Sequence, residues 1–207
     1  MSRIMELENI PHKVAYRRIK YPRVELTTGQ LCFILPQASR LEAIFQKHEK
    51  WIKKKLDFIE ECLKESSKKE LIQREEDDFK GLVLTLIMQA ANELDVRLNN
   101  VYFREMKTKW ASLSARKNLT INKQAKYLPE YLIRYIAFHE LVHLKQKRHN
   151  DKFWEIISKK FKNRDALEKG LFVYWFRLNS QFFEPPLVTS PGIQKSNESL
   201  AKERVFD

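Results

Sequence analysis

Five consecutive residues near the middle of the chain have the types and spacing of a hydrolytic metal site. They read His139-Glu140-Leu141-Val142-His143, the pattern HExxH. On a helix, residues four apart differ by about 40° in direction and about 6 Å in height, so their imidazoles can bind one cation. Glu140 lies one position round the helix, within reach of a water on that cation. The pattern predicts His139 and His143 as zinc ligands and Glu140 as the catalytic base.

The third ligand predicted is His149, six residues after His143. On an unbroken helix this offset would place it about 120° and about 9 Å away, out of reach of the metal. The helix must therefore end near Lys147 or Arg148. Asn150 tolerates the left-handed conformation that closes a helix, so we expect it to do so here.

Two alternatives to this ligand set stay open. The third ligand could be Glu168, as in zinc peptidases that use two histidines and one acid. His139 and His143 could also be core histidines, since they share an apolar helix face. A purely structural zinc is disfavoured, because such sites are usually rich in cysteine, and Cys32 and Cys62 are the chain's two cysteines.

Hydrophobic spacing predicts an α+β fold that positions this site. We expect an N-terminal β-hairpin and a small antiparallel or mixed sheet packed on the HExxH helix. The expected domain covers residues 1–183, with a strand-rich part at about 10–36 and a helical, catalytic part at about 40–180. Residues 184–207, rich in Pro, Ser, Lys and Glu, are expected to form a flexible tail. The elements expected from spacing are a hairpin turn at 27–30, helices at about 41–64, 77–94 and 164–178, strands within 95–128, and helices starting near 129 and 151.

Composition narrows the classes of partner. The 207 residues are 43% hydrophobic and 32% charged, which is typical of a soluble globular protein. The formal charge of +12 favours anionic partners such as nucleotides or nucleic acid, although a solvated basic surface is the more ordinary explanation. Neither GxGxxG nor GxxxxGK[ST] is present. The N-terminus has no apolar signal core, so we expect a cytoplasmic protein without membrane association.

The order of several segments resembles one family, the YgjP-like metallopeptidase-type domains, which are related to WLM and SprT-like zinc proteins. The resemblance runs from about residue 13 to 178, and this order of segments is much more specific than HExxH alone. The segments that carry it are Arg17-Arg18, Lys50-Trp51-Ile52, KTKWASLS at 107–114, LTIN at 119–122, HELVHLKQKRH at 139–149, and 150–154.

This resemblance implies His139, His143 and His149 as ligands of one zinc ion, or of another divalent metal, with Glu140 as base. It also implies an edge strand near Trp110 above the active-site helix. The candidate substrate contacts are Trp110, Ser112, Arg17 and Arg18. A core position explains Trp110 at least as well, and a solvated strand face is the preferred interpretation of the arginines.

One departure from the family concerns this strand. Relatives usually carry Trp-Gly-Ser-Cys-Ser, whereas this chain has Ala111 and Leu113 in place of the glycine and the cysteine. The substrate strand is therefore expected to differ in shape, because alanine lacks the backbone freedom of glycine.

The function predicted is hydrolysis of peptide bonds by a zinc-bound water that Glu140 activates. Two alternatives follow from the resemblance and the positive charge. The first is a metal-dependent nucleoside triphosphate pyrophosphatase of the UTP type. The second is a DNA-associated, SprT-like protease or binding protein. Tyr131, Tyr135 and Tyr174 are candidate oxyanion donors, and nothing in the sequence chooses among them.

Overall fold

The computed structural model describes residues 12–27 and 30–179. These residues form five α-helices and two three-stranded sheets, which confirms the α+β prediction. Contacts divide the described residues into two compact units, one within residues 12–64 and one of residues 65–178. A single domain over 1–183 stays a prediction. The flexible tail predicted at 184–207 lies outside the described residues.

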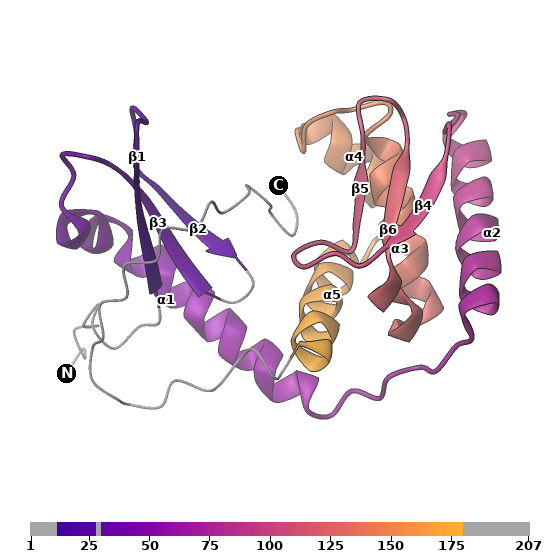
Figure 1. The fold of residues 1–207 in the computed structure, drawn as a ribbon, viewed down its shortest axis with the longest axis horizontal. Helices are drawn as coiled ribbons and strands as arrows, with labels where there is room; N and C mark the ends of the chain where they lie inside the picture. The colour runs from indigo at the N-terminus through magenta and orange to yellow at the C-terminus, as the bar shows by residue number, and fades with distance from the viewer. Residues whose placement is uncertain (1–11, 28–29, 180–207) are drawn as a thin grey trace. The chain divides into compact units, whose positions relative to one another are not determined.

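The first unit contains a mixed sheet and most of one long helix (Figure 1). Its elements are β1 (His12–Arg17), β2 (Arg23–Thr27), β3 (Gln30–Pro36) and α1 (Leu41–Ser66). β2 and β3 form the predicted antiparallel hairpin, with Thr27 opposite Gln30, and β1 adds to β3 in parallel. Phe33 and Leu35 of β3 pack on Phe45 and Ile52 of α1, because alternation along a strand turns these side chains to one face.

The second unit carries the HExxH segment. Its elements are α2 (Glu76–Leu94), β4 (Val101–Arg104), β5 (Ala111–Leu113), β6 (Leu119–Asn122), the 3₁₀ helix η2 (Lys123–Tyr127), α3 (Glu130–Val142), α4 (Asp151–Lys160) and α5 (Arg164–Leu178). The sheet has the order β4-β6-β5, with β4 parallel and β5 antiparallel to the central strand, so β5 is an edge strand of this sheet.

α3 is the central helix of this unit. From Leu132 to Val142 every residue except Arg134 is buried, so the helix needs neighbours on several sides. α2, α4, α5 and strand β5 all contact it (Figure 1). The predicted packing of a small sheet on the HExxH helix is therefore present through β5.

α2 and α3 run parallel. Arg134 donates to Gln89 Oε1 at 2.7 Å. The Lys160 ammonium then pairs with Glu93 and lies over the Phe138 ring, one turn further along both helices. The carboxyl ends of α2 and α3 consequently lie at the same end of the unit. No helix in the described ranges is both long and apolar enough to cross a membrane.

Candidate metal centre

The three predicted histidine ligands come together at the carboxyl end of α3. The ring nitrogens that His139, His143 and His149 offer all lie within 4.8 Å of one another, and the two Nε2 atoms of His139 and His149 are 3.0 Å apart. His139 lies in the last turn of α3, and His143 is its C-cap with helical φ and ψ, so the i, i+4 spacing brings the two rings together. The arrangement brings three neutral-nitrogen donors to one point.

The chain turns toward His149 earlier than predicted. α3 ends at Val142, and the N–H groups of Lys145 and Gln146 both donate to the Val142 carbonyl, at 2.9 and 2.8 Å. The expectation that the helix continues to residue 147 or 148 was wrong, because these bonds close the helix one turn sooner.

The expected conformation of Asn150 was also wrong. Its backbone is extended, with φ −88° and ψ 179°, and it caps α4 instead of closing α3. Its side-chain Oδ1 accepts the N–H of Phe153 at 3.0 Å. Since the chain has already turned before this residue, the Asn150 side chain can accept a hydrogen bond from a backbone N–H in the first turn of α4, which has no partner within the helix.

Aromatic rings of α4 pack against the three histidines. Phe153, which is fully buried, has its ring centroid 4.9, 4.7 and 4.5 Å from those of His139, His143 and His149. Trp154 stacks nearly parallel on His149 at 5.3 Å, and the Arg164 guanidinium lies over the Trp154 ring at 4.5 Å. Two consecutive residues of α4 thus fix the ring of the third histidine.

The surroundings of His139 and His143 favour forms that can bind a metal. Burial above all, and then the neighbouring His143 and His149, hold the pKa of His139 well below its usual range. His143 Nδ1 lies 3.1 Å from the carbonyl of Gln146. A carbonyl can only accept, so Nδ1 carries the proton and the lone pair stays on Nε2.

Glu140 lies against the edge strand of the sheet. Its side chain is only 7% exposed, and burial raises the pKa of its carboxyl to about 7. The backbone N–H of Leu113 in β5 donates to this carboxyl and opposes the shift, as does the charge of Lys109. Leu113, which replaces the usual family cysteine, therefore contributes its backbone to the site.

Glu168, the alternative ligand, is engaged elsewhere. Tyr135 donates its hydroxyl to Glu168 Oε1 at 2.8 Å, and Glu168 is absent from the group of converging donors. Burial raises the pKa of Glu168. Burial, and then the charge of Glu168, raise the pKa of the Tyr135 phenol well above its usual value. The pair forms a polar layer one helical turn before His139.

The candidate substrate contacts have different positions. Trp110 is completely buried, with its ring edge-on to Trp175 at 5.1 Å, so it lies in the core, and its contact with substrate stays a prediction. Ser112 is half-buried in the edge strand β5. Arg17 and Arg18 belong to the first unit, and their contact with substrate stays a prediction.

Asn122 has a structural role that sequence reasoning missed. Its fully buried amide donates to the carbonyls of Met106 and Lys109, at 2.8 Å each, and its Oδ1 accepts the N–H of Gln124. It thereby shapes the loop that leads into β5 and places Lys109 near Glu140. An asparagine that ends a strand just before a helical turn is the signal that could have revealed it.

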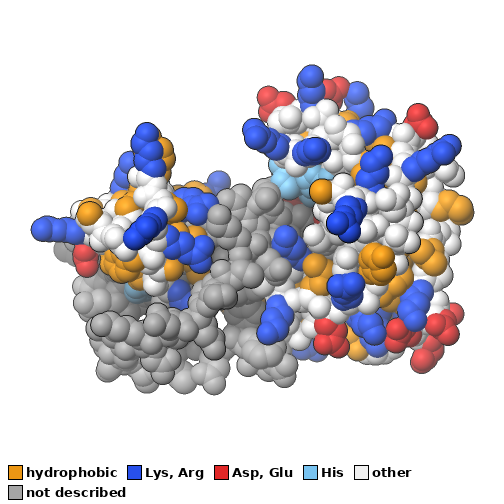
Figure 2. All heavy atoms as spheres, turned by 45° about the horizontal axis from the view of Figure 1, so that its top comes forward, with side chains coloured by type: hydrophobic (Ala, Val, Ile, Leu, Met, Phe, Trp, Pro, Cys, Tyr) orange, Lys and Arg blue, Asp and Glu red, His pale blue; other side chains and the backbone are white. Residues whose placement is uncertain are grey.

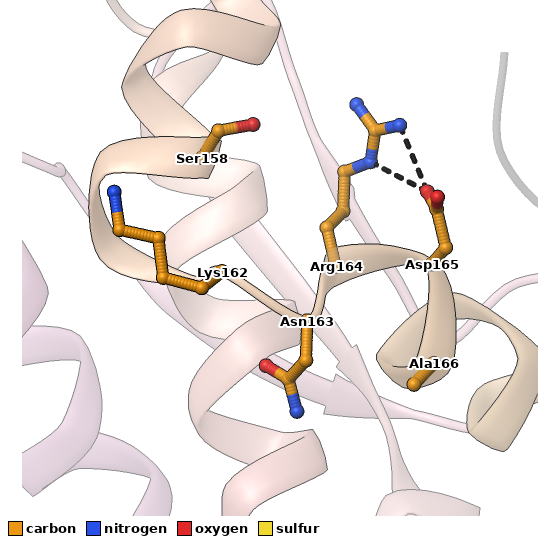
Figure 3. Close-up of a pocket in the computed structure, with 6 residues that line it drawn as sticks. All are labelled: Ser158, Lys162, Asn163, Arg164, Asp165 and Ala166. Carbon is orange, nitrogen blue, oxygen red and sulfur yellow. Dashed lines mark hydrogen bonds and ion pairs between the residues drawn. The ribbon is translucent and has the colours of Figure 1, made fainter.

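A pocket at the turn between α4 and α5 is separate from the histidines. It is lined by Ser158, Lys162, Asn163, Arg164, Asp165 and Ala166. Figure 3 shows Arg164 directed toward Asp165, whose Oδ1 accepts from Nε and Nη2 at 3.0 and 2.8 Å. None of the predicted site residues lines this pocket.

Comparison with known proteins agrees with these observations. The family model of the YgjP-like metallopeptidase domain matches residues 79–171. No curated protein matches the chain.

Two solved structures are similar in sequence, and both are metallopeptidase zymogens. Abylysin of Pyrococcus abyssi is 30% identical, over 42% of this chain and 87% of that chain, with a TM-score of 0.38. Jannalysin of Methanocaldococcus jannaschii is 26% identical, over 49% of this chain and 97% of that chain, with a TM-score of 0.40. With these TM-scores the relationship rests on sequence, and on that basis the chain belongs to the YgjP-like metallopeptidase family.

Proposed function

We propose that this protein is a zinc-dependent metallopeptidase that uses Glu140 as its general base. The observation that carries the proposal is the convergence of three imidazole nitrogens within 4.8 Å of one another, next to the buried carboxylate of Glu140, which follows His139 on α3. Membership of a metallopeptidase family supports it independently of this geometry.

The donor set fits zinc. Among the residues that the structure describes, the converging donors are three imidazoles, and three histidine ligands are typical of catalytic zinc sites that keep one position for water or substrate. The depressed pKa of His139 and the hydrogen bond from His143 Nδ1–H to Gln146 both favour the neutral, metal-binding form. A bound zinc ion would act as a Lewis acid at this point.

Glu140 is suited to transfer a proton during hydrolysis. A pKa near 7 lets the carboxyl exchange protons close to neutral pH, and a cation at the histidines would further favour the charged, basic form. The carboxylate takes a proton from the attacking water and then donates it to the leaving amine. The hydrogen bond from the Leu113 N–H orients the carboxylate for both steps.

The edge strand beside Glu140 suits an extended peptide. β5 pairs with β6 on one side, and an incoming strand could add to its other side through backbone hydrogen bonds. Because Leu113 in this strand contacts Glu140, a peptide bound along β5 would run past the catalytic carboxylate. A nucleotide gains nothing comparable from a strand edge, so we favour peptide substrates over nucleoside triphosphates.

Metal removal tests the proposed function. We expect the purified protein to hold about one zinc ion per chain and to cleave unstructured peptides. Chelation should abolish cleavage, and added zinc should restore it. Elemental analysis and mass spectrometry of peptide products would measure both effects. Pyrophosphate release from UTP without any peptide cleavage would instead favour the nucleotide reaction, and zinc-free but active protein would exclude both.

Trp154 is expected to act as a positioning residue for His149. Trp154→Leu removes the stacked ring and should weaken zinc binding about 10-fold, the lower end of what outer-shell partners contribute. Trp154→Phe keeps an aromatic ring and should bind zinc nearly as tightly as the wild-type protein. Titration against a competing chelator measures both affinities. Equal zinc affinity in all three proteins would show that the stacking has no positioning role.

A further inference from the structure

Exposed cations border the candidate metal centre. Lys145, Lys147 and Arg148 occupy the loop between His143 and His149, and all three are exposed. Lys109 precedes β5, and its charge acts on Glu140. We call these four cations the basic rim. None of them forms an ion pair within the described part of the chain, and Figure 2 shows blue side chains near the pale blue histidines.

One cluster of acidic residues of the same unit lies at the amino end of α2, away from the histidines. It comprises four consecutive acids, residues 75–78, of which Glu76 pairs with Lys80 and Lys123 and Asp77 pairs with Lys80. Because α2 and α3 run parallel with Gln89 beside Arg134, a rise of 1.5 Å per residue places Lys80 about 20 Å from His139 along the helix axes. This acidic cluster is therefore remote from the histidines, whereas the basic rim borders them and forms no ion pair among the described residues.

The cations of the basic rim favour substrates that carry negative charge near the reaction centre. Between residues 139 and 152 the chain carries four cations and two carboxylates, and one of those carboxylates is the catalytic Glu140. Three neutral imidazoles add no negative charge to offset a bound divalent ion. Potentials of one sign at an open site concentrate ligands of the other sign and speed their association.

We propose that the substrate of this centre is an acidic peptide segment, with Asp or Glu within a few residues of the scissile bond. The proposal rests on the proposed peptidase function and deepens it by naming a substrate class. Extended backbone along β5 accounts for the peptide, and the basic rim accounts for its acidic side chains. The rim cations would contact those side chains on either side of the bond that is cleaved.

Three peptides that differ only in flanking charge test this inference. Each has the same length and the same apolar centre, flanked by Glu, Gln or Lys. At low salt we expect the Glu peptide to have a kcat/KM about 10-fold above that of the Gln peptide, and the Lys peptide to be the poorest. The difference should fall below about twofold in ~0.5 M salt, because exposed charges are then screened.

Matched variants test whether the basic rim causes the preference for the Glu peptide. Lys147→Gln and Arg148→Gln should each lower the Glu preference by about two- to threefold. Lys80→Gln removes the same charge far from the site and should leave the preference unchanged. Fluorescence anisotropy of the labelled peptides on zinc-loaded Glu140→Gln protein gives the same ranking without turnover.

The outcomes separate this proposal from the proposed function. Equal cleavage and equal binding of the three peptides would overturn the acidic preference and leave the peptidase intact. Cleavage of no peptide by zinc-loaded protein, together with hydrolysis of UTP, would overturn both. A Glu preference that persists unchanged in Lys147→Gln and Arg148→Gln would show that the basic rim is not its source.

Discussion

The variant Glu140→Gln should bind zinc as the wild-type protein does and should cleave peptides about 10²- to 10⁴-fold more slowly, the range that general-base catalysis contributes. Glutamine has nearly the same shape as glutamate, and its carbonyl oxygen can still accept the Leu113 N–H. The glutamine amide, however, cannot take a proton from water at neutral pH. The fold and the metal should therefore persist while the chemical step fails.

The measurement is kcat/KM on one peptide, with zinc content determined on the same samples. Lys80→Gln serves as the control for a change at a charged residue remote from the histidines, and it should retain full activity. If Glu140→Gln kept more than about a tenth of wild-type activity with normal zinc content, another group would have to be the base.

The second large effect is expected at the third ligand. His149→Ala should weaken zinc binding by more than about 100-fold, because it removes a direct donor and exceeds the loss typical of an outer-shell partner. Glu168→Gln should keep zinc affinity within about threefold, since glutamine can still accept the hydrogen bond of Tyr135. Activity should follow metal content in both variants.

This pair of variants decides between the two ligand sets that the sequence leaves open. Competition with a chromogenic chelator measures both affinities, and thermal unfolding checks that each protein is folded. Strong zinc loss in Glu168→Gln with little loss in His149→Ala would contradict the three-histidine centre and would assign the third position to the acid.

Local patterns explain what could be predicted from the sequence. The i, i+4 spacing of His139 and His143 depends only on helix geometry, so their convergence follows from the chain itself. The helices α1, α2 and α5 were predicted to within a few residues, because apolar side chains repeat with the helical period over at least 15 residues. The β2–β3 hairpin follows in the same way from alternation around a turn.

What the sequence could not supply depends on contacts between distant residues. The parallel pairing of β1 with β3 requires tertiary structure, since the two strands are not joined by a turn. Asn150 suits both a left-handed helix end and an N-cap, and only the early turn after Val142 decides between them. The burial of Trp110 likewise depends on Trp175, which is 65 residues away in the sequence.

The single phenyl ring of Phe153 beneath three imidazoles has a consequence for how the ion enters and leaves. Each histidine ring contacts that same buried ring, so a rotamer change at one of them would disturb packing that all three share. Metal binding should then require little rearrangement of the metal-free protein. We expect metal release to be slow for the same reason, because the packed rings would have to move as the ion leaves.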